Sequence, residues 1–266
     1  MRLGQYLASI LVDRAPLTEY DVKLSEDGQS VVCWVPSTEN QPFSVRSMDH
    51  APHPSILLSS RVVLDGRECG RKCLTKAKDG SGVSMNVRDT ISTSDYTRRT
   101  LWFGKQAVTD DDAYLNAKIS PDFGSIIVEI REVEHNATYK KKTDYRRINA
   151  AFAPKVLHEK SKKGLGHSVQ LGEEVQSKYN RKSNHATIRQ VATFTFRYRT
   201  IELLRAQGIA PPLPSPAAKN VGLSGDDLID LTLDDSDERV KREDVETKIK
   251  REKKRVRREN EIIDLT

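Results

Sequence analysis

The segment "VATFTFRYRT" at residues 191–200 indicates the fold more clearly than any other part of the sequence. Aromatic residues occupy every second position from Phe194 to Tyr198, and threonine or arginine occupies the positions between and after them. This period of two is that of a β-strand with one buried face, whereas an amphipathic helix repeats about every 3.6 residues. The segment therefore predicts a half-buried strand late in the chain.

Earlier segments alternate in the same way and are bounded by turn residues such as Asp65-Gly66. In one of them, Val31, Cys33 and Val35 fall on one face while Trp34 falls on the other, so this strand is expected to lie between two layers. We therefore predict a mainly β fold, an antiparallel β-sandwich-like domain. The alternating segments are "SVVCWV" (30–35), "SRVVLDG" (60–66) and "GSIIVEIREVE" (124–134), and the first sixteen residues supply an opening strand.

A short helix is predicted directly after the late strand, over "TIELLRAQG" (200–208). Thr200 suits the N-cap, Glu202 lies in the first turn where the helix dipole favours an acid, and Gly208 suits the position after the helix. Four prolines in the next eleven residues then end regular structure. We place a β-rich domain at 1–209, a Pro-rich linker at 210–225 and a charged tail at 226–266.

A basic insertion interrupts the predicted domain at about residues 136–187. So long a break inside a β domain predicts a mobile loop that carries one or two helices. Residues 139–182 hold twelve bases and four acids, together with aromatic residues that can stack on unpaired nucleic-acid bases. The alternative is a solvated loop whose lysines prevent association, because no recognisable nucleic-acid module frames it. The aromatic residues are Tyr139, Tyr145, Phe152 and Tyr179.

The two ends of the predicted domain resemble a known family. "MRLGQYLASILVDRAPLTEYDV" and "FTFRYRTIELLRAQGIAPP" are similar to the phrases that bracket a domain of unknown function abundant in mushroom-forming fungi. Asp13-Arg14 departs from the acid-glycine pair expected at the first turn. The resemblance covers about residues 1–212 and implies a β-rich fold, with no assigned activity. The matching positions are Leu17, Glu19, Tyr20, Phe194, Phe196, Arg197, Tyr198, Arg199, Leu203, Leu204, Gly208, Ile209 and Pro211.

The formal net charge of +6 is unevenly distributed. Residues 1–219 hold 33 Lys/Arg and 24 Asp/Glu, whereas residues 220–266 hold 11 and 14. Within the tail, residues 226–238 carry seven acids and no base, and residues 239–258 carry eleven bases and four acids. Such blocks are typical of interaction tails, so we expect this part of the chain to be disordered or partly helical.

The sequence favours a reducing compartment and no membrane partner. No run approaches the roughly 18 apolar residues of a membrane span. Asp13 and Arg14 interrupt the apolar N-terminal stretch, so this stretch does not have the pattern of a signal peptide. Three cysteines are a sparse, odd set that suits free thiols.

No catalytic motif such as a Walker A loop, G-x-S-x-G or H-E-x-x-H occurs in the sequence. We therefore expect a non-enzymatic protein without a cofactor. The one candidate zinc set combines His50 and His53 of "HAPH" with Cys69 and Cys73 of "CGRKC". Structural zinc sites usually place paired ligands within one finger-like unit, so surface histidines and free thiols are the favoured interpretation.

Two similar phrases stand in the tail, "DLIDLT" at 227–232 and "EIIDLT" at 261–266. An extended chain of this composition can pair with an exposed sheet edge, while neighbouring acids meet basic residues of the partner. The phrases closely resemble the motifs that bind the small ubiquitin-like modifier SUMO. The predicted binding residues are Leu228, Ile229, Asp230 and Leu231 in the first copy, and Ile262, Ile263, Asp264 and Leu265 in the second.

The tail also contains "VKRE" at 240–243 and "IKRE" at 249–252, which match the acceptor pattern for SUMO attachment at Lys241 and Lys250. The alternative is a charged helix over residues 239–259, held by i,i+4 ion pairs, which would hide the extended form that conjugation prefers. A helix that depends mainly on such pairs is marginal.

A basic cluster near the end of the tail is typical of a nuclear import signal, although the same residues could also bind phosphate groups. We therefore expect a non-enzymatic nuclear interaction protein whose tail binds SUMO or SUMO-modified proteins and an import receptor. The alternative is a nucleic-acid-binding or chromatin-associated protein that uses the basic insertion and this cluster. The cluster consists of Lys253, Lys254, Arg255, Arg257 and Arg258.

Overall fold

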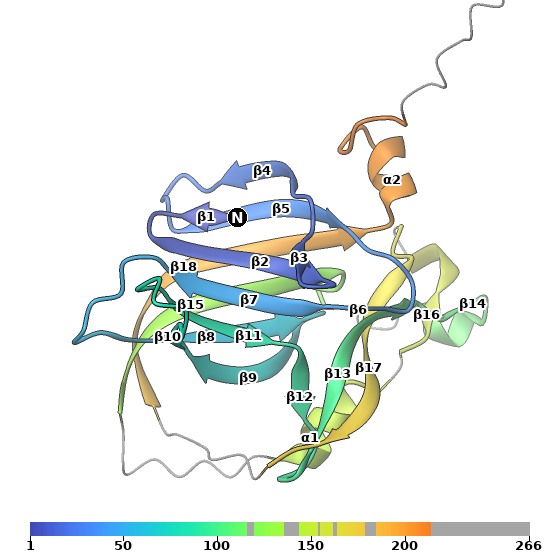
Figure 1. Ribbon diagram of the computed structural model, residues 1–266. Coiled ribbons are helices and arrows are strands. Elements are labelled where there is room, and N and C mark those ends of the chain that lie inside the picture. The colour runs from blue at the N-terminus through green and yellow to red at the C-terminus, as the bar shows by residue number, and fades with distance from the viewer. Residues whose placement is uncertain (116–119, 136–143, 154, 162–163, 179–184, 214–266) are drawn as a thin grey trace, which may run out of the picture. The chain divides into compact units, whose positions relative to one another are not determined.

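Two facing β-sheets, a smaller third sheet and a two-stranded parallel sheet are present in a computed structural model of the chain (Figure 1). Contacts divide the chain into a unit at Met1–Leu213 and a unit at Pro214–Thr266. The structure describes residues 1–115, 120–135, 144–153, 155–161, 164–178 and 185–213.

Sheet 1 is built from the first ninety residues in the order β1-β2-β7-β11-β10, with β3 paired to β2. All of its neighbouring strands are antiparallel. Asp13 and Arg14 form the turn after β2 with φ of 50° and 66°, so two non-glycine residues adopt the left-handed conformation there. The strands are β1 (Arg2–Leu3), β2 (Tyr6–Val12), β3 (Ala15–Pro16), β7 (Ser44–Asp49), β10 (Thr75–Lys76) and β11 (Ser84–Arg88).

Sheet 2 has the order β4-β5-β18-β15-β8-β9 and unites strands from both ends of the domain. The pair β5–β18 is parallel, so this sheet is mixed, whereas its other pairs are antiparallel. The strands are β4 (Tyr20–Leu24), β5 (Ser30–Pro36), β8 (Leu57–Leu64), β9 (Arg67–Cys73), β15 (Ser125–His135) and β18 (His185–Arg199).

The strands predicted from alternation are confirmed as β5, β8, β15 and β18. In β18, Phe194, Phe196 and Tyr198 are at most 1% exposed, as the period of two predicts. The Asp65-Gly66 turn joins β8 to β9 with positive φ at both positions. The two faces of β5 differ in burial, because Val31, Cys33 and Val35 are buried whereas Val32 and Trp34 on the outer face are half-buried.

A single hydrophobic cluster joins the facing sides of sheets 1 and 2 to sheet 3. The ring of Phe103 links them directly, because it lies 4.3 Å from the ring centre of Phe43 and 5.1 Å from that of Tyr198. Aromatic pairs at such distances add to the free energy gained by burial. The largest fully buried members are Ile10, Leu64, Ile91, Leu101, Phe103, Ile126, Ile130, Phe194, Phe196 and Tyr198.

Sheet 3 contains a strand that the sequence analysis placed in a loop. β17 (His167–Gln176) lies inside the predicted insertion and pairs antiparallel with β13 over its whole length. The insertion therefore contributes a ten-residue strand besides helix α1 (Tyr145–Ala151), whose N-cap Asp144 accepts a hydrogen bond from the Arg147 amide. The other strands of sheet 3 are β6 (Gln41–Pro42), β12 (Thr90–Ser92) and β13 (Thr97–Lys105).

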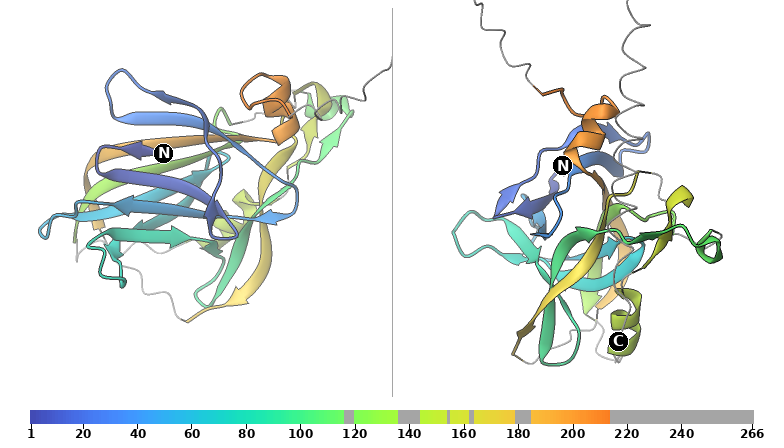
Figure 2. Two further views of the ribbon diagram at one scale, coloured as in Figure 1. Left: turned by 45° about the horizontal axis from the view of Figure 1, so that its top comes forward. Right: turned by 90° about the vertical axis from the view of Figure 1, so that its right-hand side faces the viewer.

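Short elements complete the domain, and the predicted C-terminal helix is confirmed as α2 (Ile201–Ala206). The Thr200 side chain accepts a hydrogen bond from the Leu203 amide, and Gly208 takes a φ of 68° after the helix. Helices α1 and α2 lie at opposite ends of the domain (Figures 1 and 2). Within the described ranges, no helix has the length and hydropathy needed to span a bilayer. The short elements are β14 (Val108–Thr109), β16 (Leu157–His158), η1 (Asp112–Tyr114) and η2 (Glu159–Ser161).

Candidate functional site

The tail residues with predicted roles lie outside the described residues. This holds for the SUMO-binding residues at 228–231 and 262–265, for the acceptors Lys241 and Lys250, and for the basic cluster at 253–258. Their roles stay predictions.

The four candidate zinc ligands are not brought together. Cys69 is buried in β9, where its thiol faces the Arg67 carbonyl oxygen at 3.6 Å, and His50 and His53 lie in the loop between β7 and β8. Cys73 is half-buried and lies 3.8 Å from the ring nitrogens of a histidine outside the set, His185. Among the described residues, no group of three or more His, Cys, Asp or Glu side chains is arranged to hold a metal ion.

The aromatic residues of the insertion are only in part available to a nucleic acid. Phe152 belongs to the core and lies under the Arg67 guanidinium, whose carbon is 5.5 Å from the ring centre. Stacking of Phe152 on a base, as its sequence context suggested, is therefore wrong. Tyr145 donates a hydrogen bond to Asp95, and Tyr139 and Tyr179 lie outside the described residues.

An aromatic and cationic cluster lies on the outer face of sheet 2. Trp34 of β5 stands opposite Tyr20 of β4 on one side and Arg197 of β18 on the other. The guanidinium carbons of Arg197 and Arg199 lie 5.6 Å and 5.3 Å from the centre of the Trp34 ring, which is within cation–π distance. We refer to Tyr20, Trp34, Arg197 and Arg199 as the Trp34 cluster.

The two arginines of the Trp34 cluster differ in their surroundings. Arg199 donates to the carbonyl oxygens of Tyr198 and Gly124, and burial lowers its pKa. Arg197 is exposed, and within the described part of the chain its one specific contact is the Trp34 ring. The alternation in "VATFTFRYRT" placed both arginines on the outer face, but it did not show that Trp34 lies beside them.

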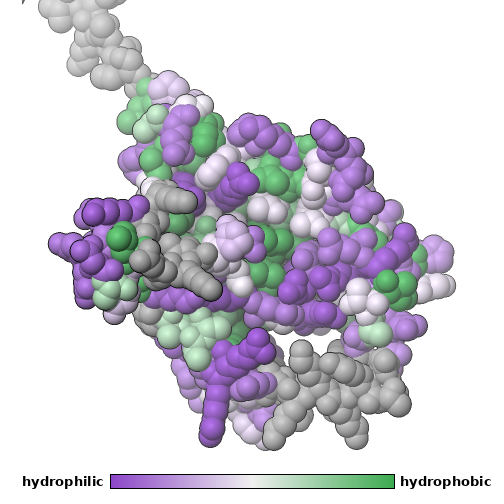
Figure 3. Space-filling model, turned by 180° about the vertical axis from the view of Figure 1, so that it is seen from behind, coloured by the Kyte–Doolittle hydropathy of each residue, from purple (hydrophilic) through white to green (hydrophobic). Residues whose placement is uncertain are grey.

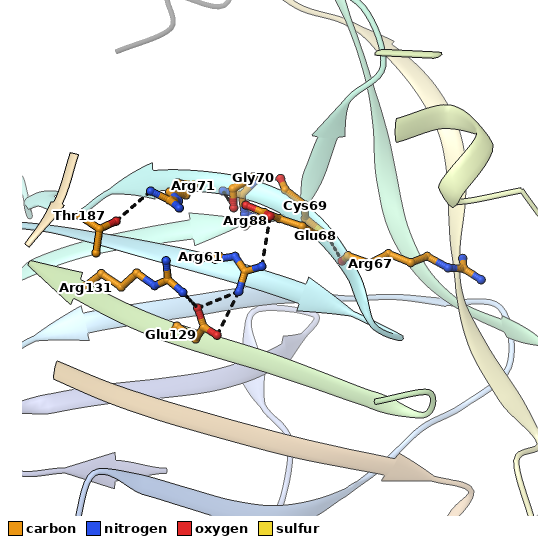
Figure 4. A network of polar contacts seen from close by, with 10 residues as sticks. All are labelled: Arg61, Arg67, Glu68, Cys69, Gly70, Arg71, Arg88, Glu129, Arg131 and Thr187. Atoms are coloured by element: carbon orange, nitrogen blue, oxygen red, sulfur yellow. Dashed lines mark hydrogen bonds and ion pairs between the residues drawn. The ribbon is translucent and has the colours of Figure 1, made fainter. Parts of the chain in front are cut away.

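A second group of charges crosses the outer face from β15 to β9 (Figure 4). Arg61 donates to both carboxylate oxygens of Glu129 at 3.0 Å and 3.1 Å and to Glu68 at 3.1 Å, while Arg131 also donates to Glu129. The hydrogen bond to Glu68 is the main reason that the pKa of Arg61 is raised. Two arginines thus face two glutamates, so this network is largely neutral and its role is to join three strands. Hydrophilic residues accordingly occupy much of this side of the molecule (Figure 3).

A reciprocal pair of contacts joins the edge of sheet 2 to sheet 1. Arg88 of β11 donates to the Cys69 carbonyl oxygen at 2.9 Å and, more weakly at 3.5 Å, to that of Gly70 in β9 (Figure 4). Lys72 of β9 donates in return to the Val87 carbonyl oxygen at 2.8 Å. We refer to Lys72 and Arg88 as the basic clasp. It satisfies carbonyl groups that the edge strand β9 would otherwise leave unpaired.

A deeply buried carboxylate belongs to the Asp65 turn, where Asp65 is 2% exposed. One oxygen accepts hydrogen bonds from the Gly124 amide at 2.9 Å and the Tyr198 hydroxyl at 2.5 Å, and the other accepts from the Val169 amide at 2.7 Å. Burial raises the pKa of Asp65, while these three donors act in the opposite direction. From the sequence, Asp65 was predicted only to be a turn residue. Its contacts show a structural joint between β8, β15, β17 and β18.

A buried serine–histidine contact was also not foreseen. The Ser37 hydroxyl lies 2.8 Å from His167 Nδ1, and burial lowers the pKa of His167, which favours the neutral ring. A nucleophile must reach its substrate, whereas Ser37 and His167 are 4% and 8% exposed. This contact therefore joins the end of β5 to β17 and is not a catalytic dyad.

The described domain is thus a β fold built around two facing sheets, and its surface carries clustered cations. The chain belongs to the family described as Domain of unknown function (DUF7918), whose model matches residues 7–212. The match ends one residue before the first structural unit does. No curated protein and no solved structure matches the chain. Several positions of the family resemblance form the core, including Phe194, Phe196 and Tyr198.

Proposed function

We propose that this protein is a non-enzymatic nuclear interaction protein whose tail binds SUMO. The observation that carries the proposal is the repetition of one apolar-acidic phrase, at 227–232 and 261–266. Both copies fall in the unit at 214–266, outside the family match.

Each phrase suits the addition of a strand to the edge of a partner sheet. Backbone hydrogen bonds supply affinity in this mode, and the branched residues Ile229 and Ile263 fill shallow apolar pockets. The acids between Asp234 and Glu238 meet basic residues of SUMO, which speeds encounter and fixes orientation. A flexible chain joining the two copies spans on the order of 30 Å, so both can bind one SUMO chain.

The test is a proton–nitrogen NMR titration of the full-length chain with SUMO. We compare the unaltered protein with an Ile229→Ala/Leu231→Ala variant and an Ile263→Ala/Leu265→Ala variant. A matched control, Val245→Ala/Val256→Ala, alters two apolar tail residues outside the phrases. Shifts in both phrases that disappear copy by copy support the proposal. Unchanged spectra at high micromolar SUMO reject it.

We further propose that Lys241 and Lys250 accept SUMO. The apolar residue before each lysine and the glutamate two positions after it offer a hydrophobic and a charged contact to the conjugating enzyme. Conjugation in a reconstituted reaction should fall stepwise in Lys241→Arg and Lys250→Arg variants. Lys248→Arg is the control, because Lys248 lacks that pattern. Equal conjugation of all variants contradicts the assignment.

Nuclear import is proposed to depend on the basic cluster at residues 253–258. A fluorescent fusion of the full chain should accumulate in nuclei, and alanine at the five basic positions should abolish this accumulation. Alanine at Lys140, Lys141 and Lys142 of the insertion is the control for loss of charge. Nuclear accumulation of the cluster variant rejects the proposal.

A nucleic-acid-binding function is the second candidate, and the Trp34 cluster favours it. An exposed arginine on an aromatic ring suits a single strand, whose phosphates pair with Arg197 while its bases stack on the adjacent planes. The chain has two tryptophans, so a Trp102→Phe variant makes the intrinsic fluorescence a probe of Trp34. Quenching by single-stranded DNA that weakens with salt and with Arg197→Met supports this function. Absence of quenching at low salt rejects it.

A further inference from the structure

The outer face of sheet 2 has an apolar row near its centre that solvent can reach. The row consists of Val32 of β5, Thr195 of β18 and Ile127 of β15, which stand opposite one another in three adjacent strands. All three side chains are half-buried, whereas their inward-facing neighbours Cys33 and Phe196 are fully buried. Side chains in the middle of a sheet keep contact with solvent only where no further layer packs on them. We refer to Val32, Thr195 and Ile127 as the apolar row.

The Trp34 cluster borders the apolar row on the same face. Trp34 lies two positions after Val32 in β5, and Arg197 lies two positions after Thr195 in β18. Because side chains alternate between the two faces of a strand, each of these pairs points the same way. Hydrophobic residues accordingly interrupt the hydrophilic surface near the middle of this side of the molecule (Figure 3). The face thus combines cations with apolar side chains across neighbouring strands.

The two arginines of the Trp34 cluster carry charge that no described carboxylate neutralises by direct contact. Arg199 donates to two backbone carbonyl oxygens, and Arg197 contacts the Trp34 ring. These contacts leave both formal charges in place. On the same face, by contrast, Arg61 donates to both carboxylate oxygens of Glu129. A surface that complements the Trp34 cluster is therefore acidic.

The Arg197 guanidinium is arranged to receive a carboxylate. It lies 5.6 Å from the centre of the Trp34 ring, and its N–H groups donate to no acceptor within the described part of the chain. A planar guanidinium can bind a carboxylate through two parallel hydrogen bonds. The contact with the ring restricts the side chain beforehand, so less conformational freedom is lost on binding.

We propose that the apolar row and the Trp34 cluster together form a docking surface for an acidic peptide segment of a partner protein. Branched apolar side chains of the segment cover the row, and a carboxylate beside them pairs with Arg197. This inference concerns the folded domain and goes beyond SUMO binding by the tail.

The apolar row favours a peptide over the single strand considered as the second candidate for the Trp34 cluster. A nucleic acid would use the cations, but its bases stack on planar aromatic groups. The aliphatic side chains of Val32 and Ile127 offer no such plane. Aliphatic side chains of a peptide would instead remove this surface from water, which is favourable in proportion to the apolar area buried.

The test follows the fluorescence of Trp34 in the full-length Trp102→Phe chain, titrated with a short peptide in which two leucines are flanked by glutamates. The peptide should change the emission saturably, and more weakly at high salt, because salt screens exposed charges. Two control peptides, with lysine replacing glutamate or serine replacing leucine, should bind more weakly. An equal response to all three peptides, or no response to the acidic one at low salt, overturns the proposal.

Two substitutions separate the charged contact from the apolar one. Arg197→Met keeps a long side chain but removes the charge, so it should weaken binding about tenfold or more. Val32→Thr replaces a methyl group by a hydroxyl of similar size and should weaken binding about fourfold, the value of one buried carbon. Arg146→Met removes an exposed arginine of α1 and is the control.

The melting temperature of each variant shows whether the domain is still folded, so that a loss of binding is not confused with unfolding. Unchanged binding in folded Arg197→Met and Val32→Thr chains contradicts the assignment to this surface. An equal loss in Arg146→Met means that the peptide binds through general charge and contradicts it as well.

The same fluorescence signal distinguishes the peptide from a nucleic acid. A single-stranded oligonucleotide should bind less tightly than the acidic peptide and should not respond to Val32→Thr. Tighter Arg197-dependent binding of the oligonucleotide overturns the peptide assignment and supports the nucleic-acid function. Failure of both ligands rejects both occupants, while SUMO binding is judged separately by shifts in the tail phrases.

Discussion

The Tyr198 hydroxyl donates a 2.5 Å hydrogen bond to the Asp65 carboxylate across 133 positions of the sequence. Tyr198 ends the aromatic row of the late strand β18, and Asp65 occupies the two-residue turn between β8 and β9. The Gly124 and Val169 amides complete the coordination of the same carboxylate. One side chain thus fixes the relative positions of four strands.

Removal of the Tyr198 hydroxyl should destabilise the domain. Tyr198→Phe leaves the ring in the core but deprives a buried carboxylate of one donor, at a cost of about 1–3 kcal/mol. Asp65→Asn should cost a similar amount, because an amide offers one oxygen where the carboxylate uses two. Asparagine tolerates the positive φ at this position, so backbone strain does not confuse the result. Urea denaturation measures both changes.

The double variant provides the control for that prediction. If Tyr198 and Asp65 act through their hydrogen bond, the combined loss should be smaller than the sum of the single losses. Full additivity would contradict a direct contact between the two side chains.

Gly172 should not tolerate a side chain. An alanine Cβ at this position would lie 2.1 Å from Trp102 Nε1 and 2.5 Å from Thr100 Oγ1, because the indole of β13 lies over β17. We expect Gly172→Ala to lower the free energy of unfolding by about 1–3 kcal/mol, as overpacking does. Glu174→Ala, exposed in the same strand, should change it by less than about 0.5 kcal/mol. Equal stability of both variants would contradict the pairing of β17 with β13.

Stability should decline at alkaline pH through the buried thiols. Burial raises the pKa of Cys33 and of Cys69 from 9.0 to about 12. Above pH 9 the unfolded chain loses these protons while the folded chain keeps them, so the free energy of unfolding falls by about 1.4 kcal/mol per pH unit for each thiol until the folded pKa is reached. Below pH 9 both states are protonated and the thiols contribute no pH dependence.

The measurement is the urea midpoint at pH 8, 9, 10 and 11. A Cys33→Ala/Cys69→Ala variant starts from lower stability, because it loses buried side chains, but its alkaline slope should be shallower. Parallel curves for the variant and the unaltered protein would show that other groups control this pH range.

The two tail phrases should act together on a SUMO chain and independently on single SUMO. Loss of either copy by Ile→Ala and Leu→Ala substitution should lower affinity for tethered SUMO about a hundredfold, and should remove only one of two sites for the monomer. Biolayer interferometry with immobilised SUMO chains checks this. A loss of less than about twofold on chains would mean that one copy binds alone and avidity plays no part.

The secondary structure was predictable wherever the local pattern was strong. The strands β5, β8, β15 and β18 follow from alternation of apolar residues, and α2 follows from Thr200, Glu202 and Gly208. β17 was missed because its exposed second half carries Glu173, Glu174 and Gly172, which reduce the apolar signal. The local sequence of β17 does not predict a strand, and β17 is stabilised by its pairing with β13.

The clusters on the folded domain were much less predictable than its strands. Arg197 and Arg199 were placed on the outer face by their spacing, yet the Trp34 ring beside them comes from a strand more than 150 positions earlier. The basic clasp joins two strands of different sheets. The sequence of neither strand, "CGRKC" or "SMNVR", predicts that it contacts the other. The tail phrases have the opposite character, because the prediction of their binding depends on local composition alone.

The sequence by itself determined the period of each strong strand, the cap of the final helix, the family phrases and the repeated phrase of the tail, because these depend on neighbouring residues. Only the tertiary structure decided that β5 and β18 run parallel, that Asp65 joins four strands and that Lys72 and Arg88 each donate to a backbone carbonyl oxygen of the other's strand. Such contacts join residues far apart in the chain. Burial and the hydrogen bonding of backbone carbonyl and amide groups decide which residues become partners. These partners cannot be predicted from any short segment of the sequence.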